Sequence, residues 1–232
     1  MCGRYTITVT LEELIAKYFI QEHPLIQYAP RYNAAPMQSI PAVIHDGTQN
    51  KLGELRWGLL PSWSKEDKNA AKLINARSET LLEKASFKGL VASRRCVIPA
   101  DGFYDWKVHE GGKQPMRITM RDGKLFSMAA LYDIWTGTDG ARISTCTIIT
   151  TAPNLLMKDI HDRMPVILDA DGEAQWLERS NRDIPALMKL LRPYDAEQML
   201  AYPVSSAVGD VRSDYPELIR RAGPEMVQGT LF

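Results

Sequence analysis

The stretch RCVIPADGFYDW, residues 95–106, decides the fold class of this chain. It holds two strand-like runs, 95–98 and 103–108, separated by Asp101-Gly102, a dipeptide typical of turns. Similar runs of apolar and β-branched residues between turn residues occur at 40–44, 52–57, 116–120, 125–131 and 143–150. The middle of the chain therefore predicts a sheet of many short strands.

Helix signals lie on both sides of these strands. Thr10 and Glu13 have the spacing of a capping box, which predicts a helix directly after a first strand over residues 2–9. Asn154 can cap a short helix reaching His161, followed by a strand at 164–168, and further helices are predicted over 78–90, 173–179 and 184–191. Because strands and helices do not alternate, the pattern favours an α+β fold. We expect a single compact domain over residues 1–232, with a central, mostly antiparallel, barrel-like sheet flanked by helices and a tail from about residue 216 that could be peripheral.

The overall composition narrows the class of function. Lys plus Arg and Asp plus Glu are both 28, so binding to nucleic acid would need a local cluster of cations instead of a global basic charge. The three cysteines contain no C-x-x-C pair, which argues against a disulfide framework or a zinc site, and no metal or cofactor is expected. The first residues lack the apolar core of a signal peptide, and no apolar run approaches membrane-spanning length. We therefore expect a cytoplasmic protein without a membrane segment.

Cys2 is the first candidate for chemistry. Removal of Met1 would leave an α-amine with a reference pKa of about 7.7–8.0 beside a thiol with one of about 8.5. Such an amine can attack an aldehyde to give an imine, and the thiol of the same residue can then close a thiazolidine ring. The alternative is a small buried side chain that starts the first strand, since free Cys is often buried. The residue type alone favours this alternative. The position at residue 2 favours the chemical interpretation, so that the two become equally strong.

Two further residues are candidates for proton transfer. His161 lies between a short helix and a strand, and its side chain has a reference pKa suited to proton transfer near neutrality, although a single His is more often structural. Asp105 lies between two aromatic neighbours in the predicted strand 103–108. It could act as a general base or lie on the solvated face of that strand.

Polar segments at 31–36, 75–80 and 56–63 could bind DNA. Arg side chains bind phosphate through two parallel hydrogen bonds, and Asn can orient a reacting group. Trp57 and Trp63 flank a Gly and a Pro, so each could pack in the core or stack on an unpaired base. Routine loop hydrogen bonds and core packing remain alternative explanations for all three segments.

Taken together, these motifs closely resemble the SRAP family, the SOS response-associated peptidase-like or abasic-site processing proteins. The matching stretches stand in the family's order and extend from residue 1 to about residue 215: 1–5, 32–36, 56–63, 75–80, 95–100, 102–106, 150–154 and 161–165. An ordered set of this kind identifies the family far more specifically than any single motif.

The resemblance implies covalent capture of abasic sites in single-stranded DNA, including its junctions with duplex, through a thiazolidine crosslink at Cys2. It also implies lyase and self-processing activity, a compact α+β fold, a monomer without cofactor, and association with the nucleoid when bound to DNA. By position, it makes Cys2 the nucleophile, Asn33 the residue that orients it, and Asp105 and His161 acid/base groups. The implied DNA-binding residues are Arg4, Trp57, Asn75, Arg77 and Arg163.

One position departs from the family pattern. The aromatic motif usually carries Glu where this chain has Asp105, whose side chain is one methylene shorter. A displacement of that size at a reacting group can lower a rate by about 100-fold. Two other functions stay open: a Cys-type peptidase that uses Cys2 with His161 as base, and a module that binds single-stranded DNA without covalent chemistry.

Overall fold

Five strands close into a barrel-like ring in the computed structural model, which describes residues 3–21, 28–64 and 73–223. Their order is β10-β4-β3-β6-β9, and β9 pairs again with β10, which closes the ring. Every pairing in the ring is antiparallel except that of β10 with β4. The strands are β3 (Ser39–His45), β4 (Asn50–Trp57), β6 (Arg95–Ala100), β9 (Phe126–Thr136) and β10 (Arg142–Thr151).

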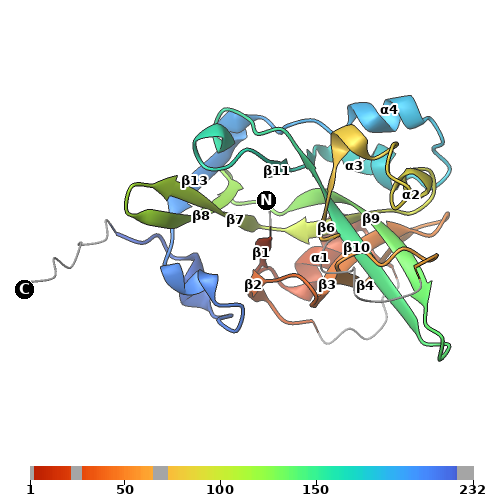
Figure 1. Cartoon of the computed structure of the whole chain (residues 1–232), viewed down its shortest axis with the longest axis horizontal. Coiled ribbons are helices and arrows are strands. Elements are labelled where there is room, and N and C mark those ends of the chain that lie inside the picture. Colours follow the sequence, from red (N-terminus) through yellow and green to blue (C-terminus); the bar gives the residue numbers. More distant parts are fainter. Residues whose placement is uncertain (1–2, 22–27, 65–72, 224–232) are drawn as a thin grey trace, which may run out of the picture.

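A second, antiparallel sheet packs beside the ring. Its order is β13-β8-β7-β1-β2, and Figure 1 shows β1 in the middle of the molecule, between the strands of the two sheets. The strands are β1 (Arg4–Ile7), β2 (Arg31–Ala34), β7 (Gly102–His109), β8 (Gly112–Met120) and β13 (Met199–Pro203). Three shorter strands extend the ring: β5 (Asn75–Arg77) and β11 (Met164–Pro165) along β10, and β12 (Ile167–Leu168) along β9.

The helices cover the outside of these sheets. They are α1 (Leu11–Tyr18), α2 (Lys88–Val91), α3 (Ala170–Leu177) and α4 (Ile184–Lys189), and the last three gather on one side of the ring (Figure 1). The capping box of Thr10 and Glu13 is present at the start of α1, as predicted. Among the described residues, no helix is long and apolar enough to cross a membrane. The predicted α+β fold with a mostly antiparallel, barrel-like sheet is confirmed.

The structure differs from the expected elements in several places. Residues 78–90 do not form one helix but a 3₁₀ turn, η2 (Ser78–Thr80), followed by turns and α2. The predicted strand at 164–168 is divided into β11 and β12, and β2, β5 and β13 were not predicted. The start of the tail is packed, not peripheral, because Leu218 of η6 (Pro216–Ile219) is fully buried and the Ala222 N–H donates to the Pro203 carbonyl.

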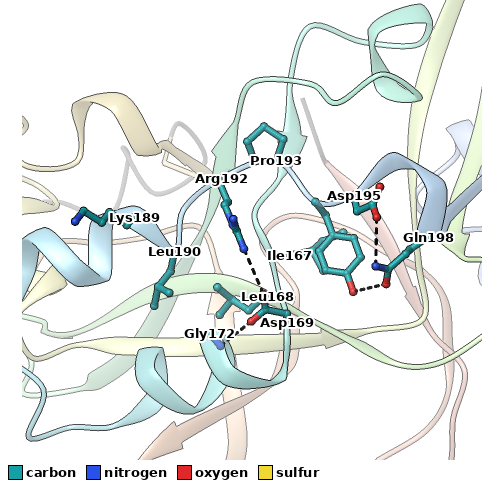
Figure 2. Close-up of a pocket in the computed structure, with 11 residues that line it drawn as sticks. Ile167, Leu168, Asp169, Gly172, Lys189, Leu190, Arg192, Pro193, Asp195 and Gln198 are labelled. Carbon is teal, nitrogen blue, oxygen red and sulfur yellow. Dashed lines mark hydrogen bonds and ion pairs between the residues drawn. The ribbon is translucent and has the colours of Figure 1, made fainter.

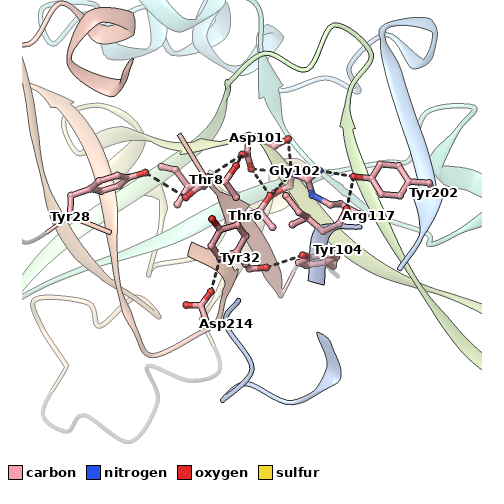
Figure 3. A network of polar contacts seen from close by, with 12 residues as sticks. Thr6, Thr8, Tyr28, Tyr32, Asp101, Gly102, Tyr104, Arg117, Tyr202 and Asp214 are labelled. Carbon is pink, nitrogen blue, oxygen red and sulfur yellow. Dashed lines mark hydrogen bonds and ion pairs between the residues drawn. The ribbon is translucent and has the colours of Figure 1, made fainter. Parts of the chain in front are cut away.

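The Asp101-Gly102 step connects the two sheets instead of turning between paired strands. β6 ends in the ring at Ala100, and β7 begins the second sheet at Gly102. A Cβ atom at Gly102 would lie 2.8 Å from the Arg117 Nε and 2.9 Å from the Thr6 hydroxyl, so any larger residue would force these two buried side chains to shift. Figure 3 shows the polar network that packs around this step.

Candidate active site

A cavity of about 490 Å³ contains both of the predicted acid/base residues. Asp105 and Trp106 reach it from β7, Lys113 from β8, and His161 from the segment after the 3₁₀ turn η3 (Met157–Asp159). Gly209, at the end of the 3₁₀ turn η5 (Ser206–Gly209), completes the wall. The volume is in the range of sites that bind small ligands or reacting groups.

Asp105 and His161 face each other across this cavity. The His161 Nε2 lies 3.9 Å from the Asp105 Oδ1, slightly beyond direct hydrogen-bond distance. Asp105 is only 2% exposed, and its Oδ1 accepts the Trp106 N–H at 3.0 Å. Burial raises the pKa of the Asp105 carboxyl, and the nearby His161 acts in the opposite direction. A carboxyl with a raised pKa is suited to proton transfer near neutral pH.

The other ring nitrogen of His161 has two neighbours. The Arg163 N–H donates to Nδ1 at 3.0 Å, and the Asp162 Oδ1 lies 2.7 Å from the same nitrogen. When Nδ1 accepts from Arg163, the ring proton of neutral His161 is on Nε2 and faces Asp105. When Nδ1 is protonated, the Asp162 Oδ1 can accept a hydrogen bond from it. The surroundings therefore suit a ring that exchanges protons on the cavity side.

The start of β1 lies beside this cavity, whereas Cys2 itself lies outside the described residues. Arg4, the first residue of β1, is paired with Tyr104, the neighbour of Asp105 on β7. The guanidinium of Arg4 donates to the Val208 carbonyl at 2.7 Å and the Gly209 carbonyl at 3.2 Å. Arg4 therefore fixes the cavity wall at Gly209, and burial lowers the pKa of its guanidinium.

Asn33 holds the same wall from β2. Its side chain is fully buried, its Oδ1 accepts from Arg4 at 3.1 Å, and its amide donates to three backbone carbonyls. These are Val208 at 3.2 Å, Asp210 at 3.0 Å and Ser213 at 2.8 Å. Asn33 does not itself line the cavity, and its contacts give it a role in shaping the wall. The predicted contact of Asn33 with Cys2 lies outside the described residues.

Trp57 is fully buried, which contradicts the predicted stacking on a DNA base. Its ring packs edge-on against Tyr5 with centroids 5.7 Å apart, and its indole N–H donates to the Ile74 carbonyl. Trp63, six residues later in the same motif, is 65% exposed. Of these two rings, only that of Trp63 is accessible to a base.

Arg77 and Arg163 come together at β10. Arg77 ends β5 opposite Thr150, and the Arg163 guanidinium donates to the Thr150 carbonyl at 2.7 Å. Asn75 lies on the same short strand, opposite Ile148. Three of the five predicted DNA-binding residues thus share one edge of the ring, whereas Trp57 is buried and the half-buried Arg4 binds the carbonyls of Val208 and Gly209.

The family model described as "SOS response associated peptidase (SRAP)" matches residues 1–211. The chain belongs to this family. The chain is 50% identical over 221 residues to the abasic site processing protein YoqW of Bacillus subtilis, covering 94% of this chain and 99% of the relative. It is 38% identical over 225 residues to the abasic site processing protein HMCES of Gallus gallus, covering 83% of this chain and 66% of the relative.

Solved structures agree with the SRAP assignment at the level of the fold. The crystal structure of a protein from Bacteroides thetaiotaomicron superimposes with a TM-score of 0.85 at 28% identity, covering 95% of this chain and all of that one. A protein from Bordetella bronchiseptica gives a TM-score of 0.75 at 26% identity, covering 88% of this chain and all of that one.

Two larger cavities of this SRAP chain, each of about 580 Å³, lie away from Asp105 and His161. Figure 2 shows the first, where the Tyr194 hydroxyl donates to Gln198, Gln198 donates to Asp195, and Arg192 is 3.6 Å from Asp169. These polar groups contact one another, and neither cavity is lined by Asp105 or His161. Among the described residues, no group of three or more His, Cys, Asp or Glu side chains could hold a metal ion.

The contacts of Asn33 lead to a test of the cavity wall. An Asn33→Asp variant would place a carboxylate oxygen against three carbonyl oxygens with no proton to donate. We expect destabilisation of at least about 1–3 kcal/mol and faster amide hydrogen exchange across residues 206–214. Asn181→Asp is the control, because the Asn181 side-chain NH2 donates at the surface to the Gln175 carbonyl at 3.4 Å, and the Oδ1 that accepts from the Asp183 N–H is kept in Asp. If amide hydrogen exchange over residues 206–214 were equally fast in both variants, Asn33 would not be the residue that holds the cavity wall.

Proposed function

We propose that this chain captures abasic sites in single-stranded DNA as a covalent thiazolidine adduct through Cys2. The main support is the cavity in which Asp105 and His161 face each other beside the start of β1. Two residues of chain span at most about 7 Å, so Cys2 is tethered within that distance of Arg4. The names of the relatives, abasic site processing proteins, support the same substrate.

The chemistry joins an aminothiol and an aldehyde. The sugar of an abasic site opens to a free aldehyde, and the neutral α-amine that Cys2 gains when Met1 is removed adds to the aldehyde carbon. Loss of one water from the resulting carbinolamine gives an imine. The Cys2 thiol then adds to the imine carbon, and its proton passes to the imine nitrogen, which closes the thiazolidine ring. The adduct therefore has the combined composition of the protein and the DNA minus one water molecule.

We assign the proton transfers to the two residues that face the cavity. His161 donates a proton to the ring oxygen of the sugar as the ring opens, and it accepts one when the adduct reverses. Asp105 accepts a proton from the attacking amine and returns it as water leaves. Proton transfer of this kind contributes about 10²–10⁴-fold to a rate. At a separation of 3.9 Å, one water or substrate oxygen lying to the side of the two groups can hydrogen-bond to both of them.

DNA would reach the cavity along the edge that carries Arg77 and Arg163. Arg77 and Lys113 are exposed cations beside β10 and at the cavity, and both suit phosphate contacts. Trp63 offers an exposed ring for an unpaired base, which favours single strands and junctions with duplex over intact duplex. All these residues come from one chain, so we propose that a monomer is sufficient.

The mass of the product tests this function directly. The purified protein is incubated with a single-stranded oligonucleotide containing one abasic site, and the intact mass is recorded without a reducing agent. We expect the mass of the protein lacking Met1 plus that of the DNA minus one water. Cys2→Ala keeps the amine but loses the thiol, so its adduct should appear only after borohydride reduces the imine.

The same variant separates the alternatives. A stable adduct formed equally by Cys2→Ala without borohydride would rule out the thiazolidine. An imine that is not converted to a thiazolidine can undergo β-elimination, so we expect more strand cleavage with Cys2→Ala than with the native protein. Salt-sensitive DNA binding without any adduct would favour a non-covalent binding module. Turnover of a peptide that needs both Cys2 and His161 would favour a peptidase.

A further inference from the structure

Arg163 and Glu79 form a bidentate ion pair at the edge proposed to bind DNA. The Arg163 Nη1 lies 2.7 Å from Glu79 Oε1, and its Nη2 lies 2.9 Å from Oε2. This is the parallel geometry with which Arg binds a phosphate. Hydrogen bonding from Arg163 lowers the pKa of Glu79, so the carboxylate is charged at neutral pH.

The two partners differ in how firmly they are held. The Arg163 side chain is 12% exposed, and its Nη2 also donates to the Thr150 carbonyl of β10 at 2.7 Å. Its Nε is buried and has no hydrogen-bond partner within the part of the chain that the structure describes. Only the edge formed by Nη1 and Nη2 can therefore meet an outside ligand, and Glu79 occupies that edge. The Glu79 side chain is 51% exposed on η2, where it can rotate away into solvent.

We propose that Glu79 acts as an internal phosphate mimic, which competes with the DNA backbone for Arg163 and so weakens binding to undamaged single strands. A phosphate must displace the carboxylate before it can bind this guanidinium. Non-covalent binding then remains weak and reversible, and retention of the DNA depends on the covalent step in the cavity. This proposal rests on the proposed function, because it assumes that DNA lies along this edge.

The test compares three variants for binding to an undamaged, fluorescently labelled single-stranded oligonucleotide. Glu79→Gln removes the competing charge, and we expect about three- to tenfold tighter binding at low salt, with the slope of log K against log salt steeper by about 0.7 for one added phosphate contact. Glu83→Gln is the matched control, because Glu83 is exposed nearby and the net charge changes equally. In Glu79→Gln combined with Arg163→Gln, the gain should disappear.

Each outcome decides the proposal. Binding by Glu79→Gln that is equal to or weaker than native, in a variant whose thermal unfolding is unchanged, would show that Glu79 only orients Arg163. If Glu83→Gln raised the affinity for DNA by the same factor, the effect would come from the change in net charge and not from the ion pair. Glu79→Ala provides a second variant if the glutamine amide re-forms the contact or lowers stability. The mass measurement tests adduct formation, whereas this experiment tests non-covalent binding. Either proposal can therefore fail while the other holds.

Discussion

Replacing Asp105 by Asn should slow adduct formation by about 10²–10⁴-fold and at the same time stabilise the fold at neutral pH. The loss of rate follows from the loss of a proton acceptor in the cavity. The gain in stability follows from the raised pKa of the buried carboxyl. A carboxyl with a raised pKa holds its proton more tightly in the folded state, so ionisation above the unfolded pKa, about 3.9, costs stability.

Thermal unfolding at two pH values measures the predicted gain in stability of Asp105→Asn. Asn does not ionise, so the variant should unfold at a higher temperature than the native protein at pH 7, by roughly 2–4 °C for each kcal/mol removed. The difference should vanish below about pH 3.9, where the native carboxyl is protonated in both states. Unchanged adduct formation by Asp105→Asn would exclude Asp105 as the proton-transfer group.

Two control variants show whether the loss of rate is specific to the carboxylate at position 105. Asp133 is a second buried carboxylate, 5% exposed, whose Oδ1 also accepts the backbone N–H of the next residue. It lies outside the cavity, so Asp133→Asn should leave the rate of adduct formation unchanged. Asp105→Glu restores the residue usual in the family and lengthens the side chain by about 1.5 Å, one carbon–carbon bond. Since the separation from His161 is 3.9 Å, this variant should keep its activity.

Strand positions could be predicted from the sequence more reliably than strand partners. The expected runs at 40–44, 52–57 and 143–150 lie within β3, β4 and β10. Their alternation and β-branched residues are local signals. The transfer of the chain between sheets at Asp101-Gly102, and the parallel pairing of β10 with β4, depend on long-range contacts that no local pattern records. The strands β2, β5 and β13 are short and carry little alternation.

The wrong helix at 78–90 has an identifiable cause. Leu81 and Phe87 are both buried, but six positions apart they would lie on different faces of a continuous helix. Both can reach the core only if the chain turns between them. Ser78, Thr80 and Ser86 are weak helix formers, so the turns before α2 cost little. Burial of both side chains in the core therefore outweighs a continuous helix over residues 78–90.

The candidate site could be predicted only in part from the residue types. Asp105 and His161 were named from their chemistry, and the structure places both in one cavity. Asn33 was expected to orient Cys2 and Arg4 to bind DNA. The structure adds that both bind a loop at residues 208–213, about 175 to 205 positions later in the chain. No spacing in the sequence shows such a contact. The motif with Trp57 and Trp63 likewise does not show which ring the neighbouring strands cover.

Breaking the buried ion pair of Asp101 and Arg117 should strongly destabilise the fold. The carboxylate and guanidinium lie 3.2 Å apart, each about 9% exposed. Asp101 also accepts from the Thr6 and Thr8 hydroxyls and the Thr8 N–H, which fixes β1 against the turn (Figure 3). Asp101→Ala leaves the Arg117 charge buried without its partner, at a cost of about 3–5 kcal/mol.

A double-mutant cycle in urea separates the pair from its surroundings. Arg117→Met alone should also be strongly destabilising, but Arg117→Met combined with Asp101→Ala should cost less than the sum of both, because no unpaired charge remains. The exposed pair of Asp122 and Lys124, 3.0 Å apart, is the control, and Asp122→Ala should cost under about 1 kcal/mol. Since Asp101 anchors Thr6 and Thr8 on and beside β1, adduct formation should fall in Asp101→Ala even under conditions where the variant is folded. Normal adduct formation by the folded variant would mean that β1 keeps its place at the cavity without this network.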